Sequence, residues 1–164
     1  MAKSKEKHTA SSSELFGKDA FLHIIDKMQH IKEKQILELN ELYEKSNLSN
    51  IKSIISDIIS MAEQSKIFLT EIKSKPNSII IERQRDYAMY DHLLSDDISI
   101  ESGDVESLLK ATLKKSNDLV GVLSILKLNY GPDLRRRLQA LEDNEIQNKN
   151  TISNLLDTFI YRGW

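Results

Sequence analysis

Residues near the carboxyl end of the chain follow a helical spacing that is interrupted at its centre by two polar positions. Steps of four and three residues, without a slip, connect Leu134, Leu138, Leu141, Glu145, Asn148, Ile152, Leu155 and Phe159. This spacing is typical of the buried seam of a long packed helix. Glu145 and Asn148 stand where leucine would be usual, and both lie on one face of the helix. Because a buried polar group without a partner costs about 1–3 kcal/mol, and a charge costs more, we expect other polar groups to face them.

Three further segments carry the same spacing, so the sequence predicts four amphipathic helices. Their seams run through Phe21, Ile24, Met28, Ile31, Gln35, Glu38 and Leu42, through Ile51, Ile55, Ile58, Ala62, Ser65, Leu69 and Ile72, and through Val105, Leu109, Thr112, Ser116, Leu119, Leu123 and Leu126. We expect helices at residues 19–45, 51–73, 104–128 and 133–160. A flexible polar tail at residues 1–18 precedes them, and a long connection at residues 74–103, helical in part of 79–94, separates the second from the third. The predicted fold class is all-α, with a single domain over residues 19–164.

All four seams lose their apolar residues near the middle of the helix. Antiparallel packing would bring these positions into one layer across a bundle. The predicted layer contains Gln35, Glu38, Glu63, Lys66, Ser116, Glu145 and Asn148, with Ala62, Ser65 and Thr112 at the remaining central positions. Glu63 and Lys66 lie one position off their seam, on the flank of the same face. Two interpretations stay open, a structural layer that fixes helix register and a small-ligand pocket between the helices.

The composition excludes several classes of function. The 164-residue chain has no cysteine, which removes disulfides, thiolate nucleophiles and Cys-ligated metal sites. A net charge of −2 and a pI of about 6.1 give no clear signal for nucleic acid. Neither a secretory signal nor an apolar stretch of roughly 20 residues is visible, so we expect a cytoplasmic protein without a membrane span. Motifs of nucleotide-binding loops, serine hydrolases and zinc proteases are also absent from the sequence.

Three consecutive arginines, Arg135, Arg136 and Arg137, lie in the first turn of the last predicted helix. Cations at the positive end of a helix dipole are mildly unfavourable. A phosphate, an acidic partner or the acidic residues of the 74–103 connection could compensate them, which makes the run a candidate anion or partner patch. The simpler interpretation is a solvated face, because Leu134 and Leu138 bracket the run at seam spacing.

The segments around the polar positions resemble those of a known family. Residues 138–148, LQALEDNEIQN, resemble the L-x-x-L-x-x-x-E-x-x-H segment of rubrerythrin-like ferritins, and residues 59–66, ISMAEQSK, show the corresponding pattern in the second helix. Residues 105–123, VESLLKATLKKSNDLVGVL, resemble the third helix of that group. The resemblance implies a ferritin-like four-helix bundle in which a long, partly helical crossover joins two helical hairpins. It also implies self-association.

The metal ligands of that family are largely missing here. In its metal-binding members, two helices each supply Glu-x-x-His and the other two each supply a glutamate. The two histidine positions read Lys66 and Asn148, and the candidates on the other helices are Ser116 or Asn117 and Gln35 or Glu38. At most three carboxylates remain as metal ligands: Glu38, Glu63 and Glu145. We therefore expect the di-iron site to be lost and no cofactor to be bound.

From these observations we expect a non-enzymatic ferritin-like bundle that serves as a protein-interaction or self-association module. The central polar layer then takes the place of a di-metal site. One alternative is a ferritin-like oxidase or iron-handling protein that binds iron or manganese with the three glutamates as atypical ligands. The other is a small-ligand binder that uses the polar layer between the helices.

Overall fold

The computed structural model describes residues 17–83, 87–95 and 105–162, and the regular elements within them are helical. In chain order they are α2 (Gly17–Lys45), α3 (Ser49–Lys73), the 3₁₀ turn η1 (Pro76–Ser78), α4 (Ala88–Ser95), α5 (Val105–Leu126), the 3₁₀ turn η2 (Lys127–Asn129) and α6 (Pro132–Arg162). The prediction of an all-α chain is confirmed. The four long helices differ from the predicted ranges by at most two residues at either end. The predicted tail at residues 1–18 lies outside the described residues, except for its last two positions, which begin α2.

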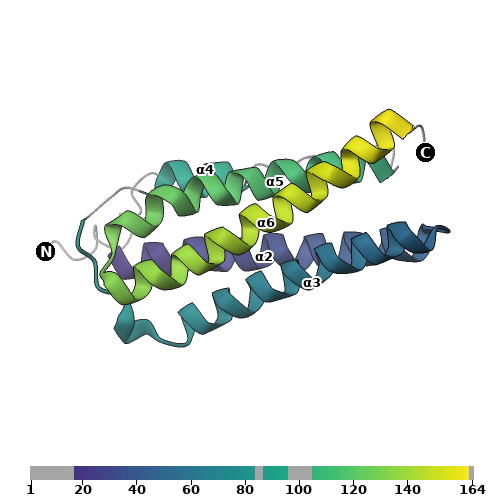
Figure 1. Ribbon diagram of the computed structural model, residues 1–164. Helices are drawn as coiled ribbons and strands as arrows, with labels where there is room; N and C mark the ends of the chain where they lie inside the picture. The colour runs from purple at the N-terminus through teal and green to yellow at the C-terminus, as the bar shows by residue number, and fades with distance from the viewer. Residues whose placement is uncertain (1–16, 84–86, 96–104, 163–164) are drawn as a thin grey trace, which may run out of the picture.

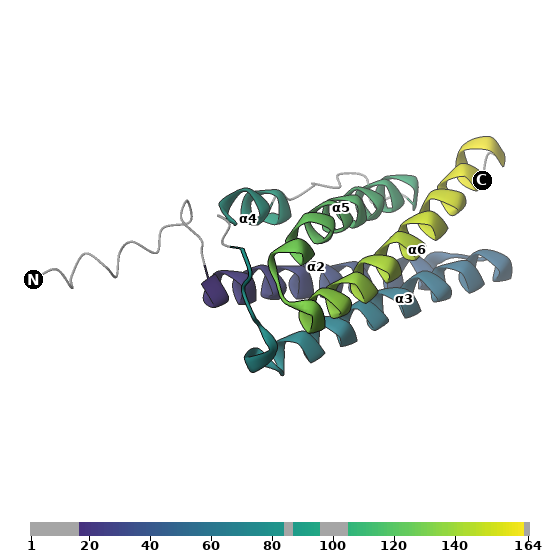
Figure 2. The ribbon, with the colours of Figure 1, turned by 60° about the vertical axis from the view of Figure 1, so that its left-hand side comes forward.

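The four long helices lie side by side (Figure 1, and turned in Figure 2). Helices α2 and α3 form one antiparallel hairpin, and α5 and α6 form another. Each of α2 and α6 packs against both α3 and α5, so α2 and α6 are diagonally opposite, and they run in the same direction. The short helix α4 packs against α2 and α5. None of the described helices combines the length and the apolar character that crossing a membrane requires.

The hydrophobic core is divided into two clusters, one toward each end of the bundle. The first includes Phe21 and Met28 of α2, Leu69 and Ile72 of α3, Leu119, Leu123 and Leu126 of α5, and Leu134, Leu138 and Leu141 of α6. The second includes Leu39 and Leu42 of α2, Ile51, Ile55 and Ile58 of α3, Leu109 of α5, and Ile152, Leu155 and Leu156 of α6. In every long helix the central polar positions fall between these two sets. The polar residues therefore form a layer that separates two apolar compartments.

The connection between the hairpins closes the end of the bundle next to the first cluster. Its backbone pairs with the turn between α5 and α6 through an isolated bridge between Ile81 and Tyr130. The Glu82 amide donates to the Asn129 carbonyl at 2.8 Å, and the Gly131 amide donates to the carbonyl of the residue before Ile81 at 2.9 Å. These hydrogen bonds satisfy backbone groups that the end of a helix leaves unpaired. The crossover is thereby fixed against the turn of the second hairpin.

Three aromatic rings fill the space under this crossover. The Phe21 and Tyr130 rings are tilted against each other with centroids 4.6 Å apart, and the Tyr87 hydroxyl hydrogen-bonds that of Tyr130. Burial, together with this hydrogen bond, raises the pKa of Tyr130 far above its ordinary value of 10.0. Both tyrosines are buried, so each hydroxyl obtains a partner inside the core.

Helix α4 is held to α2 by charged groups at the rim of the first cluster. Asp91 Oδ1 lies 2.8 Å from His23 Nε2 and 3.0 Å from Lys27 Nζ. Burial of Asp91 opposes its ionisation, but the hydrogen bonds from Lys27 and His23 outweigh that effect, so the pKa of Asp91 lies below its ordinary value of 3.8. Buried Tyr90 and Leu94 on the inner face of α4 complete the attachment.

Replacing Asp91 with asparagine should remove a pH-dependent part of the stability. Because the pKa of Asp91 is lower in the folded chain than in the unfolded one, its carboxylate stabilises the fold above about pH 4. That contribution is lost as the pH falls through the lowered pKa. We expect the free energy of unfolding of Asp91→Asn, measured by urea denaturation followed by circular dichroism, to fall less steeply below about pH 4 than that of the wild type.

A matched control is Asp57→Asn, which changes an exposed carboxylate on α3. This variant should keep the wild-type pH profile. Parallel profiles for Asp91→Asn and the wild type would contradict the role assigned to Asp91.

Candidate functional site: a buried polar layer

A buried salt bridge crosses the centre of the bundle along its diagonal. Lys32 Nζ, from α2, lies 2.9 Å from Glu145 Oε1 and 2.8 Å from Glu145 Oε2, on α6. Each side chain is 1% exposed. The ammonium therefore donates to both oxygens of one carboxylate where water is excluded. Taking two such charges out of water costs several kcal/mol per ion, which only good geometry and additional hydrogen bonds offset.

The hydrogen bonds around the carboxylate come from α3 and α6. Ser65 Oγ donates to Glu145 Oε2. Asn144 Nδ2 in turn lies 2.7 Å from Ser65 Oγ and 2.8 Å from the Met61 carbonyl oxygen, to which it donates. Glu145 thus accepts from an ammonium on α2 and a hydroxyl on α3. Three of the four long helices are joined at this one carboxylate.

A second set of polar side chains lies about one helical turn further along. Gln35 follows Lys32 by three residues, and Asn148 follows Glu145 by three, so both are displaced from the salt bridge in the same direction. The amide of Gln35 donates from Nε2 to the Thr112 carbonyl of α5 at 3.4 Å. This set brings α5 into the layer.

Among the residues that the structure describes, three polar atoms of the layer find no hydrogen-bond partner. They are Gln35 Oε1, Ser116 Oγ and Asn148 Oδ1, on residues that are 4%, 0% and 1% exposed. In folded proteins the large majority of buried side-chain polar atoms have a partner, either from the protein or from ordered water. These three atoms are therefore the part of the layer that is chemically available to a guest.

The structure brings together four of the residues predicted for the layer, Gln35, Ser116, Glu145 and Asn148, all of which are buried. Ser65 and Thr112, at two of the remaining central positions, are buried with them.

Two of the predicted residues lie outside the layer, so their assignment is wrong. Glu63 is exposed, and the Lys66 side chain is 38% exposed, with its Nζ 3.9 Å from Glu33 Oε2 on α2. These two side chains point away from the layer because a position one residue off the seam is rotated by about 100° around the helix. Glu38 of α2 is only half-buried.

Lys32 is the residue that the sequence prediction missed. The predicted seam of α2 steps from Met28 to Ile31, but the buried face steps from Met28 to Lys32, which is 0% exposed. A second seam of equally regular spacing runs through Phe21, Ile25, Met28, Lys32, Gln35, Leu39 and Leu42, and all of its members are buried. The sequence signal that favours this second seam is Leu39, because it provides an apolar residue where the first seam has Glu38.

The three carboxylates considered as metal ligands do not share a site. Glu145 is bound by Lys32, Glu63 is exposed and Glu38 is half-buried. Within the residues that the structure describes, no group of three or more His, Cys, Asp or Glu side chains is placed to hold a metal ion. The cationic group that faces Glu145 belongs to the chain itself.

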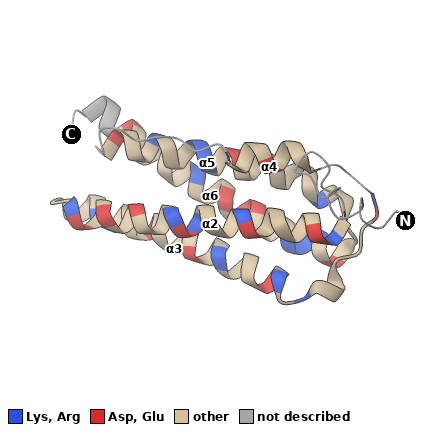
Figure 3. Cartoon of the chain, turned by 180° about the vertical axis from the view of Figure 1, so that it is seen from behind, with Lys and Arg blue, Asp and Glu red and all other residues tan. Residues whose placement is uncertain are grey.

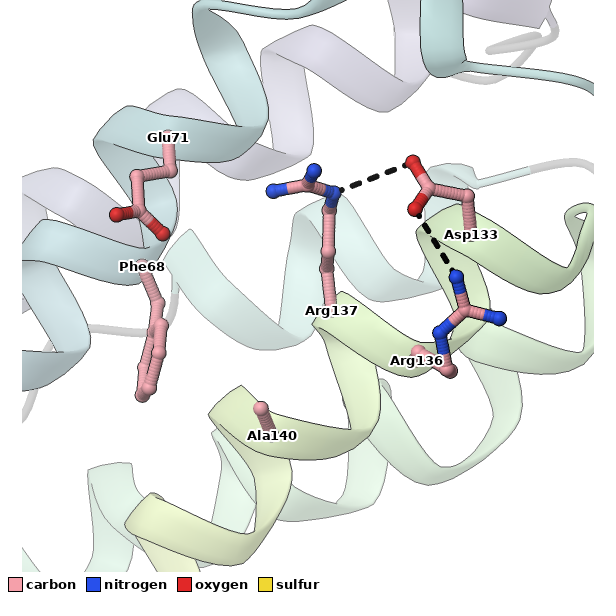
Figure 4. A pocket seen from close by; sticks show the side chains of 6 residues that line it. All are labelled: Phe68, Glu71, Asp133, Arg136, Arg137 and Ala140. Carbon is pink, nitrogen blue, oxygen red and sulfur yellow. Dashed lines mark hydrogen bonds and ion pairs between the residues drawn. The ribbon is translucent and has the colours of Figure 1, made fainter.

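Each arginine of the run has an acidic partner within the chain. Arg135 Nη2 lies 3.2 Å from Glu82 Oε1, in the connection between the hairpins. Arg136 Nη2 and Arg137 Nε each lie 3.3 Å from one oxygen of Asp133, in the first turn of the same helix (Figure 4). An acidic residue of the crossover therefore pairs with one arginine, and the other two share one carboxylate at the start of α6, where the helix dipole also favours an anion.

A surface pocket of about 270 Å³ lies beside two of these arginines, between α3 and α6. Figure 4 shows the residues that line it, which are Phe68, Glu71, Asp133, Arg136, Arg137 and Ala140. Two carboxylates offset two guanidinium groups, so the lining has no excess of either sign. On the face drawn in Figure 3, acidic and basic residues are likewise interspersed along the helices.

Comparison with known proteins gives no relative of this chain. No family model matches it, and neither a curated protein nor a solved structure matches it. The function therefore has to follow from the geometry of the molecule.

Removing one partner of the central salt bridge should destabilise the protein far more than removing both partners. Lys32→Met leaves Glu145 charged and buried, and we expect a loss of about 3–5 kcal/mol in the free energy of unfolding. The double variant Lys32→Met/Glu145→Leu removes both charges. We expect it to be about as stable as the wild type or more stable, by up to about 4 kcal/mol. Urea denaturation of the two variants and the wild type measures both differences.

The matched control is Lys66→Met, which removes a partly exposed ammonium from α3. We expect its free energy of unfolding to change by no more than about 0.5 kcal/mol. Equal losses for Lys32→Met and Lys66→Met would show that the charge on Lys32 is not buried in solution.

Proposed function

We propose that this chain is a non-enzymatic, ferritin-like helical bundle that acts through contacts with a second copy of itself or with another protein. The observation that carries the proposal is the bond of the Lys32 ammonium to both oxygens of Glu145. A ferritin-like metal centre needs carboxylates that are free to bind cations. In this chain an ammonium holds the only glutamate of the predicted ligand set that is fully buried.

The order of the helices also supports the proposal. Two antiparallel hairpins, α2 with α3 and α5 with α6, are separated by a long connection that contains the short helix α4. This order is the one expected of ferritin-like bundles. The polar layer includes Glu145 and Asn148, which stand at the Glu and His positions of the Glu-x-x-His pattern, and this supports the comparison with a metal-binding bundle.

Contacts with a partner would have to use the outer faces of the helices. Large apolar side chains are exposed there, among them Leu37 on α2, Ile80 in the crossover and Met89 on α4. Apolar residues of this kind contribute to the cores of protein–protein interfaces.

The metal content of the protein tests the first part of the proposal. After anaerobic loading with Fe(II) or Mn(II) and desalting, we expect elemental analysis to find far less than one ion per chain, because Lys32 already neutralises Glu145. The comparison variants are Glu145→Gln in the layer and Glu63→Gln on the surface. Near-stoichiometric metal in the wild type that is lost only in Glu145→Gln would overturn the proposal in favour of the iron-handling alternative.

Molar mass in solution tests the second part. Light scattering after gel filtration, over a range of protein concentrations, should give a mass that exceeds the 18.8 kDa of one chain and rises with concentration. A constant mass of one chain would exclude self-association, and the contact would then have to be with a different protein.

The small-ligand alternative keeps its own support in the three unpartnered atoms of the layer.

A further inference from the structure

Gln35, Ser116 and Asn148 bring their unpartnered polar atoms into the bundle from three different helices, α2, α5 and α6. All three residues are at least nine-tenths buried. Buried polar groups in folded proteins are bonded to the protein or to ordered water, with few exceptions. Three such atoms in one layer therefore indicate a shared partner.

The positions of these residues along their helices place the three atoms close together. Gln35 and Asn148 lie at the same level, one turn beyond the salt bridge, because α2 and α6 run in the same direction. The Thr112 carbonyl is at this level too, since it accepts from Gln35, and Ser116 is the next turn of α5 toward the salt bridge. Along the axis of the bundle, the three residues therefore lie within about one helical pitch of one another, which is about 5.4 Å.

The chemistry of the three atoms defines the guest. The amide oxygens of Gln35 and Asn148 only accept hydrogen bonds, whereas the Ser116 hydroxyl donates or accepts. The bond from Gln35 Nε2 to the Thr112 carbonyl fixes which end of that amide is the oxygen. The guest must therefore donate at least two hydrogen bonds. A cation would find only neutral oxygens here, because Lys32 already binds the Glu145 carboxylate. An anion is opposed by the two acceptors, so the guest is neutral.

We propose that Gln35, Ser116 and Asn148 form an internal binding site for one or two water molecules, next to the Lys32–Glu145 salt bridge. Water donates two hydrogen bonds and accepts two. Hydrogen bonds of about 2.8 Å on either side of one molecule span roughly one helical pitch. A buried water typically makes about three hydrogen bonds, which is the number of partners that this site offers. The inference concerns only the interior of the layer, so the metal and mass measurements can fail without affecting it.

Nuclear Overhauser experiments between water and the side-chain amides of the ¹⁵N-labelled full chain test the proposal. A water molecule held inside the protein gives cross-peaks of the opposite sign to those of rapidly exchanging surface water. We expect such cross-peaks at the side-chain amides of Gln35 and Asn148. Rotating-frame spectra separate direct contact from proton exchange with the Ser116 hydroxyl. Asn40, which is exposed on α2, is the control and should show only the surface signal.

Two variants test whether the site is shared. Asn148→Leu removes one acceptor and should abolish the bound-water cross-peak at Gln35, across the bundle. Should that variant fail to fold, Ser116→Ala provides the same test with a smaller change, and it should weaken the cross-peaks at both Gln35 and Asn148. Absence of bound-water cross-peaks in the wild type would overturn the proposal, and so would a cross-peak at Gln35 that neither variant changes.

Discussion

The two hairpins of this bundle are joined at its centre by a pair of opposite charges. Lys32 belongs to the first hairpin and Glu145 to the second, and they meet across the diagonal rather than between neighbouring helices. Apolar seams that repeat every three and four residues fit one another at more than one offset, since a slide by a full turn restores similar contacts. A slide of about 5.4 Å would instead leave an ammonium and a carboxylate buried and apart, which the low dielectric of the interior penalises heavily. The pair therefore specifies the register of the helices more than it adds to their stability.

This register determines how the rest of the core is arranged. With the polar layer at the centre, the apolar side chains form two compartments rather than one. The crossover, α4 and the buried Tyr87 and Tyr130 pack against the first compartment. Polar interactions, among them the ion pair of His23 with Asp91, hold these elements in place. Among the described residues, the second compartment is formed by side chains of the four long helices alone. The described elements outside the four long helices thus attach to one end of the bundle, the end that holds the first compartment.

Periodicity predicted most of the fold because three of the seams have a single regular solution. In α3, α5 and α6 nearly every described residue of the predicted seam is buried, including the polar ones. In α2, two seams of equal regularity share every second member. At the positions between, one has Ile24, Ile31 and Glu38, and the other has Ile25, Lys32 and Leu39. The predicted seam is the first of these, whereas the buried seam places Lys32 inward, and lysine is rarely fully buried without a partner.

The partner that buries Lys32 could not be found from local spacing. Glu145 is 113 positions away in the sequence, and only the packing of the two hairpins brings it near. The same limit applies to Arg135, whose ion pair with Glu82 depends on the backbone bridge that fixes the crossover. Polar positions were thus predictable where they lie on a seam, but their pairing was not.

An ammonium supplied by the chain differs from a bound metal ion in one decisive respect, since it is present in every folded molecule and cannot be exchanged or change its oxidation state. A layer closed in this way is suited to fixing the shape of the bundle, and what remains open to small molecules is the set of neutral acceptors beside it.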